Sequence, residues 1–177
     1  MYVVKKLIAC AITMGMFSFN ACANGQGQGL VNFKGTVIDA PCGIAPESAD
    51  QSIDFGQISK AHLEANGISV KKNLDIKLVN CDATELTSTG SVKVSFVGTT
   101  INSQNKELGT TGDTGTAVVV SEASGNLVSF DGTASAATKL QEGDNILRYS
   151  AWVKKATSGT LKEGDFTAVA NFNLTYE

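Results

Sequence analysis

The stretch FTAVANFNLTYE, residues 166–177, ends the chain with apolar and polar side chains in alternation. Val169 is the one apolar side chain out of step with this period. The others are Phe166, Ala168, Ala170, Phe172, Leu174 and Tyr176. A period of two is typical of a β-strand that turns one face towards an apolar environment. Six apolar positions in phase must cover a core or a partner, and the pattern alone favours a strand of the protein's own core.

A second alternating stretch, GQGLVNFKGTV at residues 27–37, lies near the other end of the chain. Its one face holds only glycines and apolar side chains, namely Gly27, Gly29, Val31, Phe33, Gly35 and Val37. Glycine weakens a strand because its backbone loses more entropy on ordering and it offers no side chain to pack. The pattern therefore predicts a strand over residues 31–38 that begins poorly.

Residues 1–23 have the composition of a secretory signal peptide. Two lysines precede the apolar run 7–19, and Ala21-Cys22-Ala23 has the form of a cleavage site. A membrane anchor is one alternative, but the run is shorter than the roughly 20 residues of a membrane span. A lipidated Cys22 is the other, and the residues before it make a poor lipidation signal. Cleavage after Ala23 of the 177-residue chain leaves 154 residues, enough for one domain.

The mature chain is mildly acidic and retains two cysteines. The leader takes two of the 14 basic residues and none of the 17 acidic ones, which leaves a formal charge of −5. This balance argues against nucleic acid or an anionic membrane as the partner. Cys42 and Cys81 are an even pair in an exported chain and predict one disulfide. A metal pair is the weaker alternative, because His62 is the only histidine and the spacing does not match a zinc site.

Short apolar or alternating runs recur between clusters of Gly, Ser, Thr, Asn and Asp. This arrangement is typical of an all-β sandwich. Residues 58–65 are expected to form a helical turn started by Ser59. Strands are predicted at residues 31–38, 52–55, 74–79, 91–97, 116–121, 127–130, 146–154 and 166–176. No repeat, low-complexity block or linker interrupts the chain, so one domain is expected.

No set of residues in the sequence would support catalysis. His62 is the only imidazole, and no nucleophile motif surrounds any serine. The glycine-rich run at residues 109–116 lacks the lysine of a phosphate loop. Trp152 could stack on a sugar, but its alternating surroundings favour packing on a sheet. We therefore predict no enzymatic activity, no metal site and no cofactor.

Several segments together resemble the chaperone–usher pilins of Gram-negative bacteria. They include the leader, the glycine-rich start, and Gly164, fourteenth from the end. The most specific are FKGTVIDAPC (33–42), ADQSIDFGQ (49–57), LVNCD with the second cysteine (78–82) and ANFNLTYE with its penultimate tyrosine (170–177). The resemblance extends over essentially the whole chain and is closest to the major rod pilin of P-type fimbriae.

This resemblance implies an incomplete immunoglobulin-like β-sandwich that lacks its last strand and is completed by donor-strand complementation. It divides the chain into a removed signal peptide (1–23), a donor-strand extension (24–34) and a pilin domain (35–177). The implied donor residues are Gly27, Gly29, Val31 and Phe33. The implied C-terminal, chaperone-binding strand comprises Ala170, Phe172, Leu174, Tyr176 and Glu177, preceded by Gly164.

The function implied by the resemblance is that of a structural subunit, the major pilin of an extracellular rod that supports adhesion. Its implied partners are a periplasmic chaperone, an outer-membrane usher, and identical or related pilins, without nucleic acid and without membrane insertion. A minor or adaptor pilin, or a glycan-binding fimbrial module, is the alternative. With cleavage after Ala23, three residues precede the donor face, so the extension looks shorter than in the P-type rod subunit.

Overall fold

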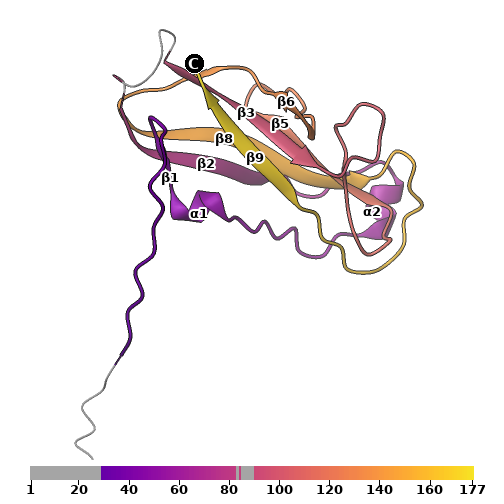
Figure 1. Cartoon of the computed structure of the whole chain (residues 1–177). Coiled ribbons are helices and arrows are strands. Elements are labelled where there is room, and N and C mark those ends of the chain that lie inside the picture. The colour runs from indigo at the N-terminus through magenta and orange to yellow at the C-terminus, as the bar shows by residue number, and fades with distance from the viewer. Residues whose placement is uncertain (1–28, 83, 85–89) are drawn as a thin grey trace, which may run out of the picture. The chain divides into compact units, whose positions relative to one another are not determined.

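The computed structural model describes residues 29–82, 84 and 90–177. The pattern of contacts along the chain separates two units, with the boundary after Thr36. Residues 29–36 form no helix or strand, whereas residues 37–177 form an all-β domain (Figure 1). The leader and Gly27 lie outside the described residues. In the described part of the chain, no helix is long and apolar enough to cross a membrane.

The first sheet is antiparallel and runs in the order β1-β2-β8-β5-β4. Its long central strands are β2 (Lys72–Cys81) and β8 (Gly143–Lys155), and β5 (Thr116–Glu122) follows. The two outer strands are short, with β1 (Gly43–Ile44) beside β2 and β4 (Leu108–Gly109) beside β5. Almost every residue of β5 is buried, as suits a valine-rich strand between two neighbours.

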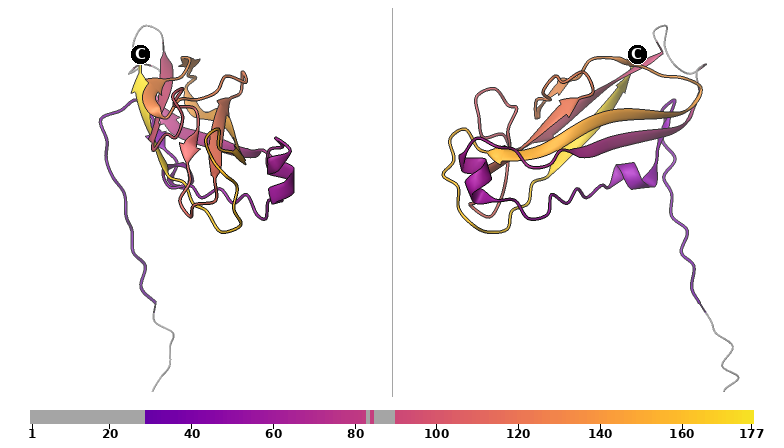
Figure 2. Two further views of the ribbon diagram at one scale, coloured as in Figure 1. Left: turned by 90° about the vertical axis from the view of Figure 1, so that its right-hand side faces the viewer. Right: turned by 180° about the vertical axis from the view of Figure 1, so that it is seen from behind.

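The second sheet is built around β3 (Ser91–Gly98). β9 (Ala170–Tyr176) pairs antiparallel with β3 along almost its whole length. The short strands β6 (Asp131–Ala134) and β7 (Thr138–Lys139) share the other edge of β3. β9 crosses the first sheet at an angle, in front of β2 and β8 in Figure 1 and behind them in the right-hand view of Figure 2. The two sheets therefore form a sandwich.

Apolar side chains from both sheets fill the space between them. Phe96 of β3 lies edge-to-face with Tyr149 of β8, at 5.2 Å between ring centroids, and with Phe130, at 6.5 Å. Ile76 and Leu78 of β2 are fully buried in the same cluster. Alternate residues of each strand thus supply the core, as a period of two requires.

Two short helices interrupt the path from β1 to β2: α1 (Pro46–Ala49) and α2 (Lys60–Glu64). The predicted helical turn is confirmed as α2, because the Ser59 hydroxyl accepts a hydrogen bond from the backbone N–H of His62. His62 is exposed, and its Nε2 lies 3.0 Å from the carbonyl oxygen of Ile68.

Most predicted strands are confirmed, and three are wrong. The predictions at 74–79, 91–97, 116–121 and 146–154 lie inside β2, β3, β5 and β8. The last strand begins at Ala170 instead of Phe166. The ranges 31–38 and 52–55 are not strands, and 127–130 makes only an isolated bridge. Each of the three alternates or is apolar as a strand would be, but no described strand of this chain forms a ladder with it.

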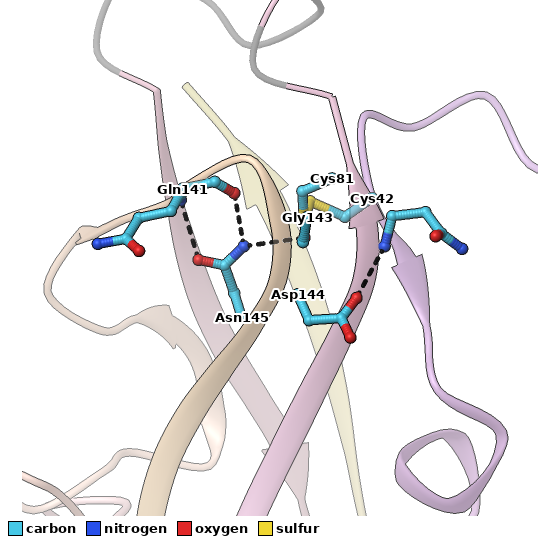
Figure 3. Close-up of a disulfide and its surroundings, with 7 residues drawn as sticks. Cys42, Cys81, Gln141, Gly143, Asp144 and Asn145 are labelled. Atoms are coloured by element: carbon cyan, nitrogen blue, oxygen red, sulfur yellow. Dashed lines mark hydrogen bonds between the residues drawn. A yellow bond between two sulfur atoms is a disulfide. The ribbon is translucent and has the colours of Figure 1, made fainter.

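The structure joins Cys42 and Cys81 in the predicted disulfide (Figure 3). The bond connects the start of β1 to the end of β2, where Cys81 also pairs with Gly143 of β8. Asp144 accepts a hydrogen bond from the backbone of Asn80 at 3.3 Å, which holds the two strand ends together. Because both thiols are consumed, this pair is not a metal site, and the described residues contain no cluster of three metal-binding side chains.

Candidate functional site

The candidate site is the edge of β9 that faces away from β3. On its paired edge, β9 matches β3 from Val92↔Tyr176 to Gly98↔Ala170 without interruption. On its other edge, no described strand pairs with it. A seven-residue strand with an unpaired row of N–H and C=O groups is a template for another strand.

The core is incompletely covered along this edge. The core-facing residues of β3, Val92, Val94 and Phe96, are at most 3% exposed. Their neighbours on β9 pack against the same core but remain only half-buried: Ala170, Phe172, Leu174 and Tyr176. The core-facing side chains of β3 are therefore fully covered, whereas those of β9 remain partly open to solvent.

Residues 51–58 border the same core, and residues 53–58 share a cavity with residues 161–166, just before β9. Ile53 and Phe55 are half-buried against the core, while Ser52 and Asp54 between them are exposed. Within the described chain, residues 52–58 make no main-chain hydrogen bond to a strand. This segment therefore has the side-chain alternation of a strand and lacks the hydrogen-bonded neighbour that would make it one. We call the space between residues 51–58 and residues 166–176 the groove.

A cavity of about 410 Å³ lies at one end of the groove. Its walls are residues 53–58 on one side and residues 161–166 on the other, with Leu63 of α2 among the lining side chains. Gly164 belongs to this wall and has a φ of 147°, which L side chains rarely adopt. The glycine that the sequence singled out thus shapes the cavity wall before β9 begins.

The other end of the groove holds the chain terminus. The backbone of Glu177 exchanges two hydrogen bonds with Ser91, at 2.8 and 2.9 Å. Its side chain forms an ion pair with Lys93 at 2.6 Å. Burial raises the pKa of the neighbouring Tyr176 phenol. The last residues are therefore held as an ordered continuation of β9.

The N-terminal alternating stretch is exposed where it is described. Val31, Phe33 and Val37 are 69%, 92% and 102% exposed. A Cβ added at Gly29 or Gly35 would meet nothing within 4 Å. Of the implied donor residues, Gly29, Val31 and Phe33 are thus exposed, and Gly27 lies outside the described residues.

The sequence identified one wall of the groove and missed the other. Gly164 and the half-buried residues of β9 lie along the groove as a set. Ile53, Phe55 and Ile58 were not singled out, although the alternation in SIDF at residues 52–55 was a usable signal. Trp152 is 9% exposed, with Lys71 Nζ 4.4 Å from its ring centroid, so it packs on the sheet as predicted.

The family model described as "Fimbrial protein" matches residues 31–177. The chain belongs to this fimbrial protein family. The fimbrial chain is 51% identical to the Pap fimbrial major pilin protein of Escherichia coli, over 98% of this chain and 100% of that protein. It is 39% identical to the fimbria A protein of Serratia marcescens, over 98% of each chain.

Solved structures agree with this assignment. The P pilus rod subunit PapA is similar with a TM-score of 0.73 and 51% identity, over 78% of this fimbrial chain and 100% of that one. A subunit in the structure of a chaperone–usher pilus is similar with a TM-score of 0.80 and 53% identity, over 86% and 97%. The immunoglobulin-like fold is confirmed, and the family consists of structural subunits rather than enzymes.

Proposed function

We propose that the chain is the major pilin of a chaperone–usher fimbria, a structural subunit that polymerises into an extracellular rod on a Gram-negative cell. The observation that carries this proposal is the half-covered row of core side chains along the open edge of β9. The end-to-end similarity to the Pap major pilin and to the P pilus rod subunit supports the same conclusion.

In this proposal residues 27–37 of one subunit fill the groove of the next, so the donated stretch ends three residues after the extension of residues 24–34 that the resemblance implies. The groove wall from Phe166 to Tyr176 and the stretch from Gly27 to Val37 each span eleven residues. At about 3.3 Å per residue, both are about 36 Å long when extended. The stretch has an apolar face for the core and main-chain groups for the open edges, so it supplies what the groove lacks.

The donated strand runs antiparallel to β9 in this proposal. An antiparallel strand places Val37 at the cavity beside Phe166 and Gly27 beside Tyr176. A parallel strand would place Gly27 at the cavity of about 410 Å³, which a glycine cannot fill. Because unfilled space forfeits packing contacts, the antiparallel arrangement is favoured.

Strand donation from each subunit to the next generates a filament, because it is a heterologous contact that does not close. Burying Val31, Phe33 and Val37 contributes roughly 1.5–3 kcal/mol each, before the cost of ordering the stretch. Release of the strand requires the core of the neighbour to reopen. The fibre is therefore expected to be kinetically stable.

The open edge supports a periplasmic chaperone and an outer-membrane usher as further partners in this proposal. An exposed strand edge above an apolar groove invites aggregation until it is covered. A chaperone strand covers the groove during export, and the usher is where the extension of the next subunit replaces it. Glu177, fixed by Ser91 and Lys93, presents the chain terminus to the chaperone in a defined position.

Electron microscopy of cells that lack this protein tests the proposed role. Loss of entire fibres is expected for a major pilin. Intact fibres that no longer adhere would instead identify an adaptor or a glycan-binding module. Re-expression of the chain should restore fibre length in proportion to its amount, because a rod subunit sets the length of its polymer.

A further inference from the structure

The outer edge of β2 is covered by a backbone ladder over only part of its length. β1 pairs with β2 only at Gly43↔Val79 and Ile44↔Leu78, although β2 is ten residues long. The backbone of Ala45 adds one more hydrogen bond, its N–H donating to the Lys77 carbonyl at 3.0 Å. Pro46 then ends the ladder, because proline has no N–H to donate.

Beyond the backbone ladder, side chains of α1 and of the residues after it hydrogen-bond to the β2 edge. The Ser48 hydroxyl accepts a hydrogen bond from the Lys77 N–H at 3.0 Å and donates one to the Asp75 carbonyl at 3.3 Å. One hydroxyl thus serves both a donor and an acceptor of the β2 edge. The Gln51 amide donates to the same Asp75 carbonyl at 3.0 Å. Ser48 is 2% exposed, so water has little access to its hydroxyl.

The two long strands therefore differ at their outer edges. On β2, the side chains of Ser48 and Gln51 occupy the Lys77 N–H and the Asp75 carbonyl, two groups that another strand would need. On β9, nothing in the described chain does so. The inner face of β2 is also apolar, with Ile76 and Leu78 in the core. An uncovered β2 edge would thus attract the same alternating stretch that the groove accepts.

We propose that Ser48 and Gln51 close the edge of β2 against strand addition, so that a second copy of this chain inserts its residues 27–37 beside β9 and not beside β2. This inference rests on the proposed strand donation. It assigns to α1 the control of where assembly takes place. A single acceptor edge gives a linear fibre, whereas a second one would give branches and aggregates.

The test counts strands bound per subunit. The full chain, held in its chaperone complex, is mixed with excess labelled peptide GQGLVNFKGTV (27–37). The same is done with the double variant Ser48→Val, Gln51→Leu. The control is Glu47→Gln, which alters an exposed ion pair of the same helix with Lys77 and leaves the edge covered. Bound peptide is measured by fluorescence, and amide exchange is followed at Lys77.

Wild type and Glu47→Gln are expected to bind one peptide. The double variant is expected to bind two, the second at least tenfold more tightly than any second peptide on wild type, with the Lys77 amide protected again when it binds. One peptide on the double variant, with a Lys77 amide that stays unprotected, would overturn the inference. No peptide on wild type would instead contradict the proposed strand donation.

A single variant keeps the inference testable if the double variant does not fold. Gln51→Leu leaves the Ser48 hydroxyl on Lys77 and Asp75. It is expected to admit a second peptide more weakly than the double variant and still more tightly than wild type. Binding identical to wild type would count against Gln51 as a guard of the edge.

Discussion

The two stretches near the ends of the chain share a period of two in apolar side chains, but only the C-terminal one forms a strand of the structure. Phe33 in the N-terminal stretch is 92% exposed, while Phe172 in β9 packs half-buried against the core. β9 has a neighbour in its own chain, β3, with which it pairs residue by residue. Residues 29–36 form no strand. A period of two therefore indicates that a segment is suited to a sheet, but not whether the sheet belongs to the same molecule.

Removal of the N-terminal stretch is expected to have the largest effect on assembly. Deletion of residues 24–34 takes away Val31 and Phe33 and should abolish fibres, because no strand remains to donate. The subunit should still be recovered with its chaperone, because the groove is intact. Electron microscopy and co-purification measure both. A matched control replaces Gln28 and Asn32, on the polar face, by serine and should keep its fibres. Fibres of normal length from the deleted chain would contradict strand donation.

The glycines of the donated face should differ in importance. Gly35 lies between Phe33 and Val37 on that face, so an arginine there must enter the apolar groove. Burying a charge without a partner costs more than about 3 kcal/mol, which is a loss of at least about a hundredfold in exchange. Gly29→Arg should cost less, because Gly29 would lie beside Leu174, near the end of the groove that holds Glu177.

Thr36→Arg is the matched control for these glycines, with the same side chain added on the opposite face. It should exchange at the wild-type rate. Each rate of exchange is measured as the displacement of the chaperone by a peptide of residues 27–37 that carries Gly35→Arg, Gly29→Arg or Thr36→Arg. A rate for Gly35→Arg equal to that for Thr36→Arg would show that this face does not enter the groove.

The disulfide bears on the junction between the exposed stretch and the domain. Residues 29–40 are exposed and Cys42 is 1% exposed, so the buried part of the chain begins at this bond. Its sequence separation is 39. Closing a loop of that length stabilises a fold by about 4 kcal/mol on the chain-entropy model. Cys42→Ser with Cys81→Ser should lower the free energy of urea unfolding by that amount in the peptide-filled subunit. A loss below about 1 kcal/mol would contradict this role.

The direction of the donated strand can be measured at Tyr176. Burial already raises the pKa of its phenol, and a strand laid over it should raise the pKa further. A peptide that lacks residues 27–30 should leave Tyr176 less covered and lower its pKa relative to the full peptide. A peptide that lacks residues 35–37 should not. The opposite pattern would indicate a parallel strand.

Tyr149 is the internal control for this titration, because burial raises its pKa and it is only 6% exposed before any peptide is added. The sign of the linked stability follows from the raised pKa. The unfolded tyrosine loses its proton first, so stability is complete below pH of about 10 and falls as pH rises through the folded pKa. The full peptide should therefore make the loss of stability above pH of about 10 larger than the peptide without residues 27–30 does, because it raises the folded pKa of Tyr176 further.

The sequence predicted the parts of the fold that depend on one strand and its own neighbours. Strands such as β5 and β8 combine β-branched residues with pairing inside the chain, and their ranges were correct within a few residues. Ser59 marked the start of α2. The ranges 31–38 and 52–55 failed as strands because alternation says nothing about whether a hydrogen-bonded partner is present.

The candidate site was predicted in part for the same reason. The apolar face of β9 could be read from the terminal pattern, and Gly164 from the resemblance to pilins. The opposing wall was missed, because the alternation of Ile53 and Phe55 indicates one buried face but not that this face packs against the same core as β9. The covering of β2 by Ser48 and Gln51 was also hidden, since a serine and a glutamine in a polar stretch carry no sign of the edge they occupy.

Cross-linking between two copies tests strand donation most directly. An antiparallel strand with Val37 beside Phe166 places Asn32 beside Asn171, both on the outer face. One copy carries Asn32→Cys, the other Asn171→Cys, and fibres grown from the mixture are oxidised. We expect disulfide-linked pairs of the two copies, and none when Lys139→Cys, on the far side of β3, replaces Asn171→Cys. Fibres that form normally without the 32–171 link, or that link to residue 139, would contradict the account.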